Sequence, residues 1–252
     1  MIPLRDENPT LRQPVATMFL VGANVLAWVF VQGLGGTEPL ARSICNLGLI
    51  PGELLGHAVA GTEVPVTRNL ACVLGNRAHL YTPVTSMFLH GSWLHIIANM
   101  WFLWIFGDNV EDAMGRWRFM FFYLICGLAA AAAQTLVDPD SVIPMVGASG
   151  AIGGVMGGYA RLYPRAHVHT LLILGIYVTT LAVPAIYMLG YWFLIQFLSG
   201  LPSLSNTTGG VAFWAHVGGF LCGILLVGWF QRPEYLAAHN RLRKRQAARY
   251  RW

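Results

Sequence analysis

Long apolar stretches separated by short polar segments run along the 252-residue chain. A helix needs about 20 apolar residues to cross the hydrocarbon core of a bilayer, so stretches near that length predict transmembrane helices. The sequence has six of them, at residues 15–34, 92–106, 119–136, 143–163, 184–200 and 211–230. The second stretch is short and is expected to extend at one end. The pattern predicts an all-α membrane protein in which six transmembrane helices form one bundle.

Composition agrees with a membrane protein and suggests how the chain is divided. Of all residues, 56% are hydrophobic and 11% are charged, whereas a soluble domain carries about 25% charged residues. We expect an N-terminal segment (residues 1–14), a membrane domain (residues 15–230) with a long outer loop (residues 35–81), and a basic tail (residues 231–252). The N-terminal segment is polar and contains proline, so it is expected to be loosely ordered.

The basic residues predict how the bundle is oriented. With six transmembrane helices, both termini lie on one side of the membrane, and all of the 16 Lys and Arg residues except Arg42, Arg68 and Arg77 fall on that side. Because cytoplasmic segments carry the excess of Lys and Arg, both termini are expected in the cytoplasm, with a bacterial inner (plasma) membrane as the expected location. The tail is expected to lie on anionic lipid, which explains most of the net charge of +5 without a nucleic-acid partner.

Two connecting segments leave structural alternatives open. The outer loop is too apolar for a disordered linker and is expected to form short helices at the membrane interface. It contains Cys45 and Cys72, and a disulfide and two free thiols are equally compatible with the sequence. Residues 169–183 could extend the fifth helix or lie along the inner interface, and Pro184, which suits a first helical position, favours the interface.

Two polar residues within apolar stretches indicate chemistry. Ser149 lies near the outer start of the fourth predicted helix, and His216 lies near the outer start of the sixth. Both helices run from the outer to the inner side, so the two side chains are expected at a similar depth. A neutral imidazole beside a serine hydroxyl is the arrangement that makes serine an effective nucleophile. Since polar groups are costly in lipid, we interpret the two residues as a catalytic pair.

Glycines surround both residues and allow two interpretations. Gly147 and Gly150 flank the serine, where a helix N-terminus offers free N–H groups to a developing oxyanion. The alternative is close packing, because small residues at every fourth position are typical of touching membrane helices. That spacing is shared by Gly150, Gly154 and Gly158, and after His216 by Gly219 and Gly223. The two interpretations are compatible if the glycines bring Ser149 and His216 together.

The second predicted helix supplies further polar groups. His95 and Asn99 are four residues apart and share a helix face. Two donors on one buried face suit an oxyanion hole, and a polar clamp between helices is the alternative. His90 lies on another face and is expected to make a structural hydrogen bond.

Carboxylates and metal ligands are sparse in the apolar stretches. No H-E-x-x-H motif occurs, and no acid is placed to complete a ligand set with the histidines, so no metal site is predicted. Asp108, Glu111 and Asp112 lie at the inner end of their stretch, and Asp138 and Asp140 lie in an outer turn. A Ser–His dyad is therefore expected rather than a triad.

Together these residues resemble the rhomboid intramembrane serine proteases over most of residues 88–230. The motifs that carry the resemblance are His90-x4-His95-x3-Asn99, then Gly107 and Glu111, then Gly147-Ala148-Ser149-Gly150, and Ala212-x3-His216-x2-Gly219-x3-Gly223. The resemblance implies that Ser149 is the nucleophile and His216 the general base. It implies an oxyanion hole formed by His95, Asn99 and the Ser149 N–H, and structural roles for His90 and Glu111.

The resemblance also implies a function. It implies a serine endopeptidase that cuts membrane-spanning proteins near the outer face of the bilayer, without a cofactor or a metal. An inactive rhomboid-like binder of membrane proteins is the alternative within the family, and a small channel or transporter is the alternative from another class. The family often has an aromatic residue four positions after the serine. Gly153 occupies that position here, so Trp214 or Phe213 is expected to support His216.

Overall fold

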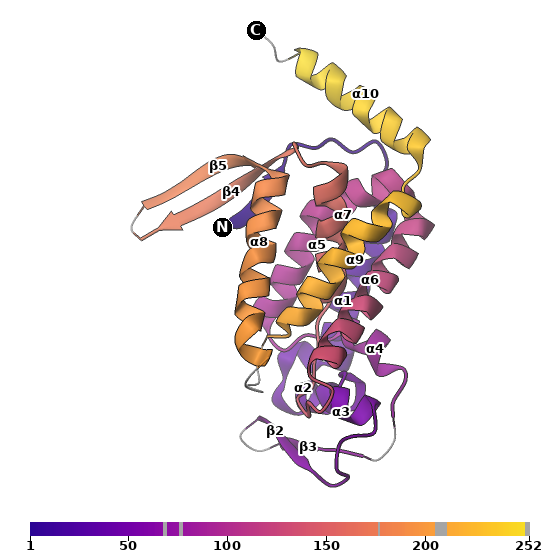
Figure 1. The fold of residues 1–252 in the computed structure, drawn as a ribbon, viewed down its shortest axis with the longest axis vertical. Helices are drawn as coiled ribbons and strands as arrows, with labels where there is room; N and C mark the ends of the chain where they lie inside the picture. The colour runs from indigo at the N-terminus through magenta and orange to yellow at the C-terminus, as the bar shows by residue number, and fades with distance from the viewer. Residues whose placement is uncertain (68–69, 76–77, 176, 205–210, 250–252) are drawn as a thin grey trace.

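Long helices lying side by side form the body of the protein in the computed structural model, which describes residues 1–67, 70–75, 78–175, 177–204 and 211–249 (Figure 1). These helices are α1 (Val15–Leu26), α5 (Trp93–Met114), α6 (Arg116–Val137), α7 (Ser149–Leu162), α8 (Ala185–Gly200) and α9 (Phe213–Phe230). Each predicted apolar stretch overlaps one of them. Within the described residues, α6, α8 with its continuation to Leu204, and α9 are long and apolar enough to cross a membrane. The chain is thus a mostly helical membrane protein, and six crossings remain a prediction.

Helix α7 lies at the centre of the bundle, because every residue from Gly150 to Ala160 is buried. Glycines allow α9 to approach it closely. A Cβ atom on Gly223 would overlap the carbonyl oxygen of Gly154, and one on Gly157 would overlap that of Phe220. Contact between two helix backbones is the way in which small residues hold membrane helices together.

The ends of α5 follow from its sequence. Ser92 caps the helix, since its hydroxyl oxygen accepts a hydrogen bond from the backbone N–H of His95 at 3.2 Å. The helix ends at Gly115, whose φ of +79° lies in the left-handed region that favours glycine, and α6 starts at the next residue. The second apolar stretch therefore extends at its inner end, as far as Met114.

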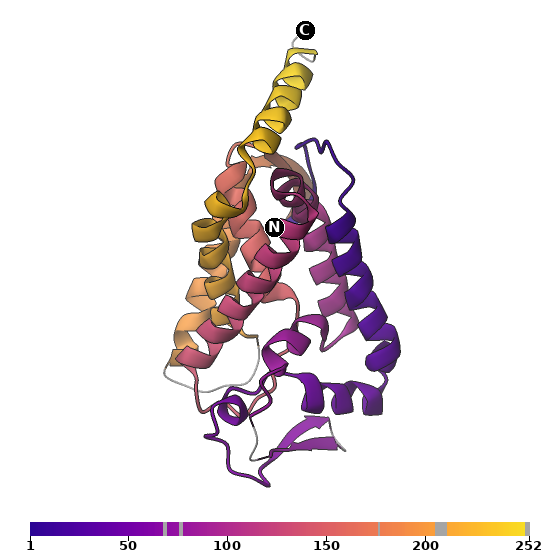
Figure 2. The same ribbon diagram turned by 90° about the vertical axis from the view of Figure 1, so that its right-hand side faces the viewer.

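Residues 35–81 cover one end of the bundle, which we call the outer end (Figure 2). The described part forms helices α2 (Thr37–Leu47) and α3 (Pro51–Leu54) and an antiparallel hairpin of strands β2 (Glu63–Thr67) and β3 (Leu70–Val73). A disulfide joins Cys45 and Cys72. The short helices agree with the prediction, but the hairpin was not expected. Arg68 and Arg77, assigned to this side from the sequence, lie outside the described residues.

Shorter elements connect the long helices. Helix α4 (Thr82–Thr85) precedes α5 and packs against α6. Single turns occupy Ala27–Val31, Gly33–Gly35, Ser86–Phe88 and Leu201–Leu204. The turn at Ala27–Val31 prolongs α1 as a π-helix, so the first apolar stretch is helical over most of its predicted length.

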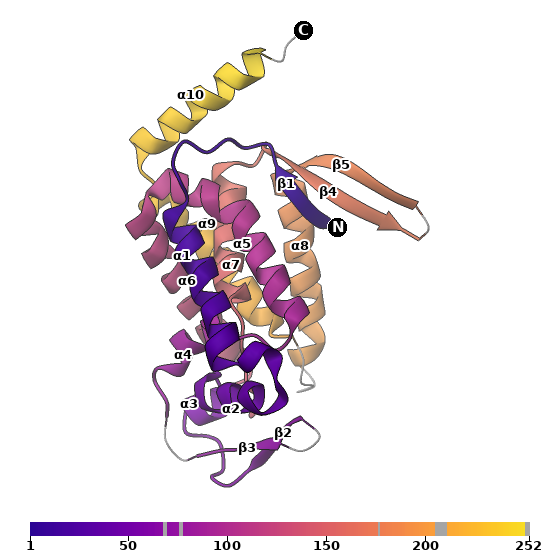
Figure 3. The same ribbon diagram turned by 180° about the vertical axis from the view of Figure 1, so that it is seen from behind.

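A three-stranded sheet lies at the opposite, inner end (Figure 3). Strand β1 (Ile2–Asp6) pairs with β4 (His167–Leu174), which pairs with β5 (Tyr177–Pro184), both antiparallel. One prediction is therefore wrong, because residues 2–6 form a strand and are not loosely ordered. Of the two alternatives for residues 169–183, extension of the fifth helix is also wrong, because β4 and β5 are strands. The position of this hairpin along the inner interface stays a prediction. Valine and threonine are frequent in residues 168–183 and favour strands, and Gly175 takes a φ of +63° where the chain turns.

The tail starts as helix α10 (Pro233–Arg249), which lies at the same end of the bundle as β1 (Figure 3). Its early part is packed rather than free. The His239 ring is fully buried, with Nδ1 3.3 Å from a carboxylate oxygen of Asp112 and Nε2 3.0 Å from the side-chain oxygen of Asn8. The N-terminal segment, the end of α5 and the start of the tail therefore form one cluster.

Candidate active site

Ser149 is the first residue of α7, and the turn before it depends on Gly147. The backbone φ of Gly147 is +133°, a value that residues other than glycine rarely adopt. The Gly147 N–H donates to the carbonyl oxygen of Ser86 at 2.9 Å. The preceding residues are extended, and Met145 exchanges two backbone hydrogen bonds with Leu49. The fourth helix therefore starts six residues later than predicted, which leaves Ser149 at a free helix N-terminus.

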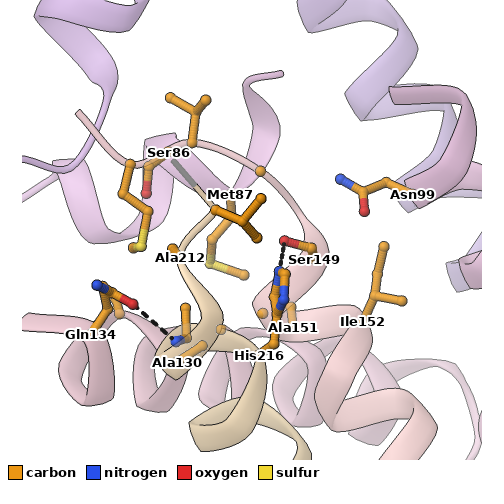
Figure 4. Close-up of a pocket in the computed structure, with 18 of the residues that line it drawn as sticks. Ser86, Met87, Asn99, Ala130, Gln134, Ser149, Ala151, Ile152, Ala212 and His216 are labelled. Atoms are coloured by element: carbon orange, nitrogen blue, oxygen red, sulfur yellow. Dashed lines mark hydrogen bonds between the residues drawn. The ribbon is translucent and has the colours of Figure 1, made fainter. Parts of the chain in front are cut away.

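His216 lies in the first turn of α9 and meets this serine. Its Nε2 atom lies 2.7 Å from Ser149 Oγ, and the two side chains face each other in a cavity (Figure 4). Both helices begin near the outer end, and the glycine contacts between α7 and α9 fix their separation. The contact agrees with the prediction that Ser149 and His216 lie at a similar depth.

His95 packs against the turn that precedes the serine. A Cβ atom on Gly147 would lie 2.8 Å from the Cε1 and Nε2 atoms of the His95 ring, so only glycine leaves room for it. The Gly91 N–H donates to His95 Nδ1 at 3.3 Å. Since Nδ1 accepts, Nε2 carries the proton in the neutral ring and presents an N–H donor beside Ser149.

Asn99 lies one turn further along α5 and lines the same cavity (Figure 4). Its side chain is 7% exposed, and its amide nitrogen has no hydrogen-bond partner among the described residues. An unpaired buried donor is costly. An amide donor that faces a cavity next to a nucleophile is free to bind a substrate oxygen.

The cavity has a volume of about 490 Å³ and lies near the outer end of the bundle, where Pro51 of α3 and Ser141 line it. Its polar lining includes Ser149, His95, Asn99, Gln134, Gln196 and His216. Gln134, on α6, accepts the backbone N–H of Ala215 at 3.3 Å and so braces the start of α9. A space of this size can hold an extended peptide segment of a few residues.

Two residues of α8 contact His216, and the sequence reasoning missed both. Gln196 Oε1 lies 2.7 Å from His216 Nδ1. The Trp192 ring lies 5.8 Å from the imidazole, measured between centroids, with the planes tilted by 40°. Neither Trp214 nor Phe213 packs on the His216 ring, so the expectation that one of them supports His216 is wrong. Trp214 turns to the end of α8, where its Nε1 donates to the carbonyl oxygen of Gly200 at 3.1 Å.

A signal for Gln196 was present in the sequence. It is the one side chain with an amide in the otherwise apolar segment Ala185–Gly200. A lone amide in such a segment indicates a polar partner on a neighbouring helix. Trp192, by contrast, is one of several aromatic residues on α8, and nothing in the sequence distinguishes it.

His90 is fully buried, and its backbone rather than its ring makes the polar contacts. Its N–H donates to Gln32 Oε1, and Gln32 Nε2 donates to its carbonyl oxygen, both at 2.8 Å. Neither ring nitrogen has a hydrogen-bond partner within the described residues, which differs from the expected side-chain bond. The ring packs edge-on against His95, with centroids 5.1 Å apart. His90 therefore supports the position of His95.

Glu111 lies near the inner end of α5, far from Ser149. Its carboxylate accepts hydrogen bonds from the backbone N–H groups of Ala16 and Thr17 at 2.9 and 2.8 Å, and from the Thr17 hydroxyl at 2.9 Å. These contacts cap the start of α1. Over the described ranges, no group of three or more His, Cys, Asp or Glu side chains is arranged to hold a metal ion.

Comparison with known proteins gives one consistent result. A family model described as the Rhomboid domain matches residues 77–233. RHOMBOID-like protein 5 of Arabidopsis thaliana is 28% identical over 191 residues, which is 71% of this chain and 54% of that protein. Rhomboid protein 1, mitochondrial, of Saccharomyces cerevisiae is 29% identical over 171 residues, which is 63% of this chain and 46% of that protein. Rhomboid-like protease 5 of Toxoplasma gondii is 29% identical over 158 residues, which is 60% of this chain and 16% of that protein. The chain thus spans about half or less of the length of these relatives.

Proposed function

The chain belongs to the rhomboid family, and from this premise we propose that it is an intramembrane serine endopeptidase. The observation that carries the proposal is the 2.7 Å contact between Ser149 Oγ and His216 Nε2 inside a cavity at the outer end of the bundle. A hydroxyl that donates to a neutral imidazole is poised to lose its proton as it attacks a carbonyl carbon.

The reaction proceeds in two steps. In the first, Ser149 Oγ bonds to the carbonyl carbon of the substrate while His216 Nε2 takes the hydroxyl proton. The peptide C–N bond then breaks, and the imidazolium gives that proton to the departing amine. In the second step His216 Nε2 takes a proton from water, whose oxygen bonds to the carbonyl carbon of the ester. The bond between that carbon and Ser149 Oγ then breaks, the imidazolium returns the proton to Oγ, and the new carboxyl end is released. No cofactor takes part.

The negative oxygen that forms in each step needs donors. The Ser149 N–H lies at the free start of α7, and the proposed partners are His95 Nε2–H and the Asn99 amide, which line the same cavity. Donors already fixed by Gly91 and by packing need no rearrangement during the reaction. Removing one oxyanion-hole donor in a serine protease typically lowers kcat by about 100- to 1,000-fold.

The proposed substrates are membrane-spanning proteins. The site lies at the end covered by residues 35–81, and the excess of Lys and Arg at the other end favours a cytoplasmic position for both termini. A transmembrane helix can be cut only where its backbone hydrogen bonds open, so residues of low helix propensity near its outer end favour cleavage.

Helix α8 forms one side of the cavity. Of the three apolar helices that are long enough to span a membrane, it is the least buried. We propose that substrates reach Ser149 past α8 and the segment after it, of which residues 205–210 lie outside the described ranges.

The membrane in which the protein resides is a separate question. Relatives whose names give a compartment are mitochondrial or chloroplastic, so they lend no support to the bacterial plasma membrane expected from the sequence. The proposal needs only a membrane whose outer side is water-accessible.

Labelling with a fluorophosphonate probe of serine hydrolases tests the function. We expect the purified protein to be labelled, and both Ser149→Ala and His216→Ala to lose labelling. Ser141→Ala is the matched control, because Ser141 lines the same cavity without contacting His216. Labelling that persists in Ser149→Ala would overturn the assignment, and an unlabelled parent protein would favour an inactive membrane-protein binder.

A further inference from the structure

The contact between Gln196 and His216 determines which nitrogen of the imidazole carries the proton. The amide oxygen of Gln196 lies 2.7 Å from His216 Nδ1, and an amide oxygen only accepts hydrogen bonds. Nδ1 must therefore carry the hydrogen. The other nitrogen, Nε2, is left with a lone pair that points at the Ser149 hydroxyl 2.7 Å away. The opposite tautomer could not accept the serine proton.

Among the described residues, no carboxylate takes this place. The polar contacts of the His216 ring are Gln196 and Ser149. An uncharged acceptor orients the ring without the cost of burying a carboxylate between membrane helices. In an aspartate-containing triad the same position also stabilises the charged imidazolium, which glutamine does only weakly.

A second contact from the same helix fixes the plane of the ring. Trp192 lies one turn before Gln196 on α8, and its ring packs on the imidazole. It occupies space that an aromatic side chain at position 153 would need, since a Cβ atom on Gly153 would lie 3.7 Å from the Trp192 ring and 3.1 Å from the carbonyl oxygen of His216. The aromatic side chain that packs on His216 is thus Trp192 of α8, since α7 has Gly153 at the corresponding position.

We infer that Gln196 is the positioning residue of the catalytic pair: its amide oxygen holds His216 in the tautomer and orientation that accept the Ser149 proton. The inference rests on the proposed function. It makes the active site a Ser–His pair with a neutral third member carried on α8.

Gln196→Ala and Gln196→Glu test this role in opposite directions. In proteoliposomes containing a membrane-spanning reporter, we expect Gln196→Ala to lower kcat by about 10- to 100-fold with KM little changed, because the imidazole loses the acceptor that holds its tautomer; this is less than the roughly 10,000-fold loss when the charged aspartate of a triad is neutralised. Gln196→Glu keeps the acceptor and should recover most of kcat. Because a carboxylate favours the charged imidazole, it should also move the acid limb of the rate–pH profile to higher pH. Leu225→Ala, at an exposed position of α9 that does not line the cavity, is the control and should resemble the parent.

The outcomes separate this inference from the proposed function. If Ser149 is not labelled in the parent protein, both the proposed function and the role of Gln196 are excluded. A labelled parent, with Gln196→Ala as fast as the parent, removes only the role of Gln196. If Gln196→Ala unfolds, the rate–pH profile of Gln196→Glu decides alone: an acid limb at the same pH as that of the parent overturns the inference, because a merely structural glutamine would not affect that profile.

Discussion

Gly219 packs so closely on Gly150 that a Cβ atom at position 219 would overlap the carbonyl oxygen of Gly150. This contact joins the helix that carries Ser149 to the helix that carries His216. We expect Gly219→Ala to force α7 and α9 apart, to destabilise the fold by about 1–3 kcal/mol or more, and to reduce probe labelling of Ser149. Thermal unfolding in detergent, together with the labelling rate, measures both effects.

Gly22→Ala is the matched control for that substitution. Gly22 lies within α1, and nothing lies within 4 Å of the position that its Cβ would take. Alanine favours helix more than glycine does, so this variant should be as stable as the parent or slightly more stable. Equal melting temperatures for Gly219→Ala and Gly22→Ala would show that the two helices do not depend on this contact.

Glu111→Gln should weaken the attachment of α1. The amide has one oxygen in place of two, so it cannot accept all three hydrogen bonds from Ala16 and Thr17. We expect a loss of about 2–3 kcal/mol in the free energy of unfolding, the range for buried hydrogen bonds to a charged group. Glu38→Gln, in an ion pair with Arg42 whose side chains are about 70% exposed, should change it by less than about 1 kcal/mol. Similar effects for the two variants would contradict the cap.

The sheet at the inner end should respond to pH through Asp6. Burial raises the pKa of Asp6 from 3.8 to about 6, although Tyr159 donates a hydrogen bond to the carboxylate. The folded protein therefore binds this proton more tightly than the unfolded chain does. The resulting stabilisation is fully present below about pH 4 and is lost as the pH rises through about 6.

Asp6→Asn isolates this effect, because its amide oxygen can still accept from Tyr159. Relative to the parent, the variant should gain melting temperature as the pH is raised from about 4.5 to about 7.5. A difference between the two proteins that stays constant over this range would show that Asp6 does not titrate as proposed.

The disulfide should stabilise the outer segment. Cys45 and Cys72 are 27 residues apart, and closing a loop of that length contributes about 3–4 kcal/mol in the chain-entropy model. In the double variant Cys45→Ser/Cys72→Ser we expect faster hydrogen exchange at the amides of β2 and β3, and little change in α7. Mass analysis after alkylation should find two of the four cysteines modified in the unreduced parent. Modification of all four would exclude the bond.

The sequence predicted the helical segments well and the inner sheet poorly. A transmembrane helix is recognised from length and apolarity alone, so each apolar stretch overlaps a long helix of the structure. Residues 169–183 are apolar too, and that property alone does not distinguish a hairpin from a helix. The partner of the hairpin, β1, lies more than 150 residues away, and no local pattern indicates such a pairing.

Within the candidate site, the sequence predicts the depth of Ser149 and His216 in the membrane but not the rotation of α8 about its own axis. The topology put Ser149 and His216 at one level, and they lie in contact. The lone amide of Gln196 on α8 indicates a polar partner on a neighbouring helix, but it does not say which residue that partner is. The aromatic residues of α8 give no signal of which of them faces inwards. That Gln196 and Trp192 both contact His216 therefore required the structure.

The cluster at the inner end also sets the order in which the protein can be completed on the ribosome. Asp6 meets Tyr159 across 153 residues, and Asn8 meets His239 across 231 residues. At the usual synthesis rate of about 5–20 residues per second, the first strand waits roughly 10 to 50 seconds for these partners. Residues 2–8 are thus made long before the strand and the helix that hold them in place, and they stay unpaired until β4 and α10 have been made.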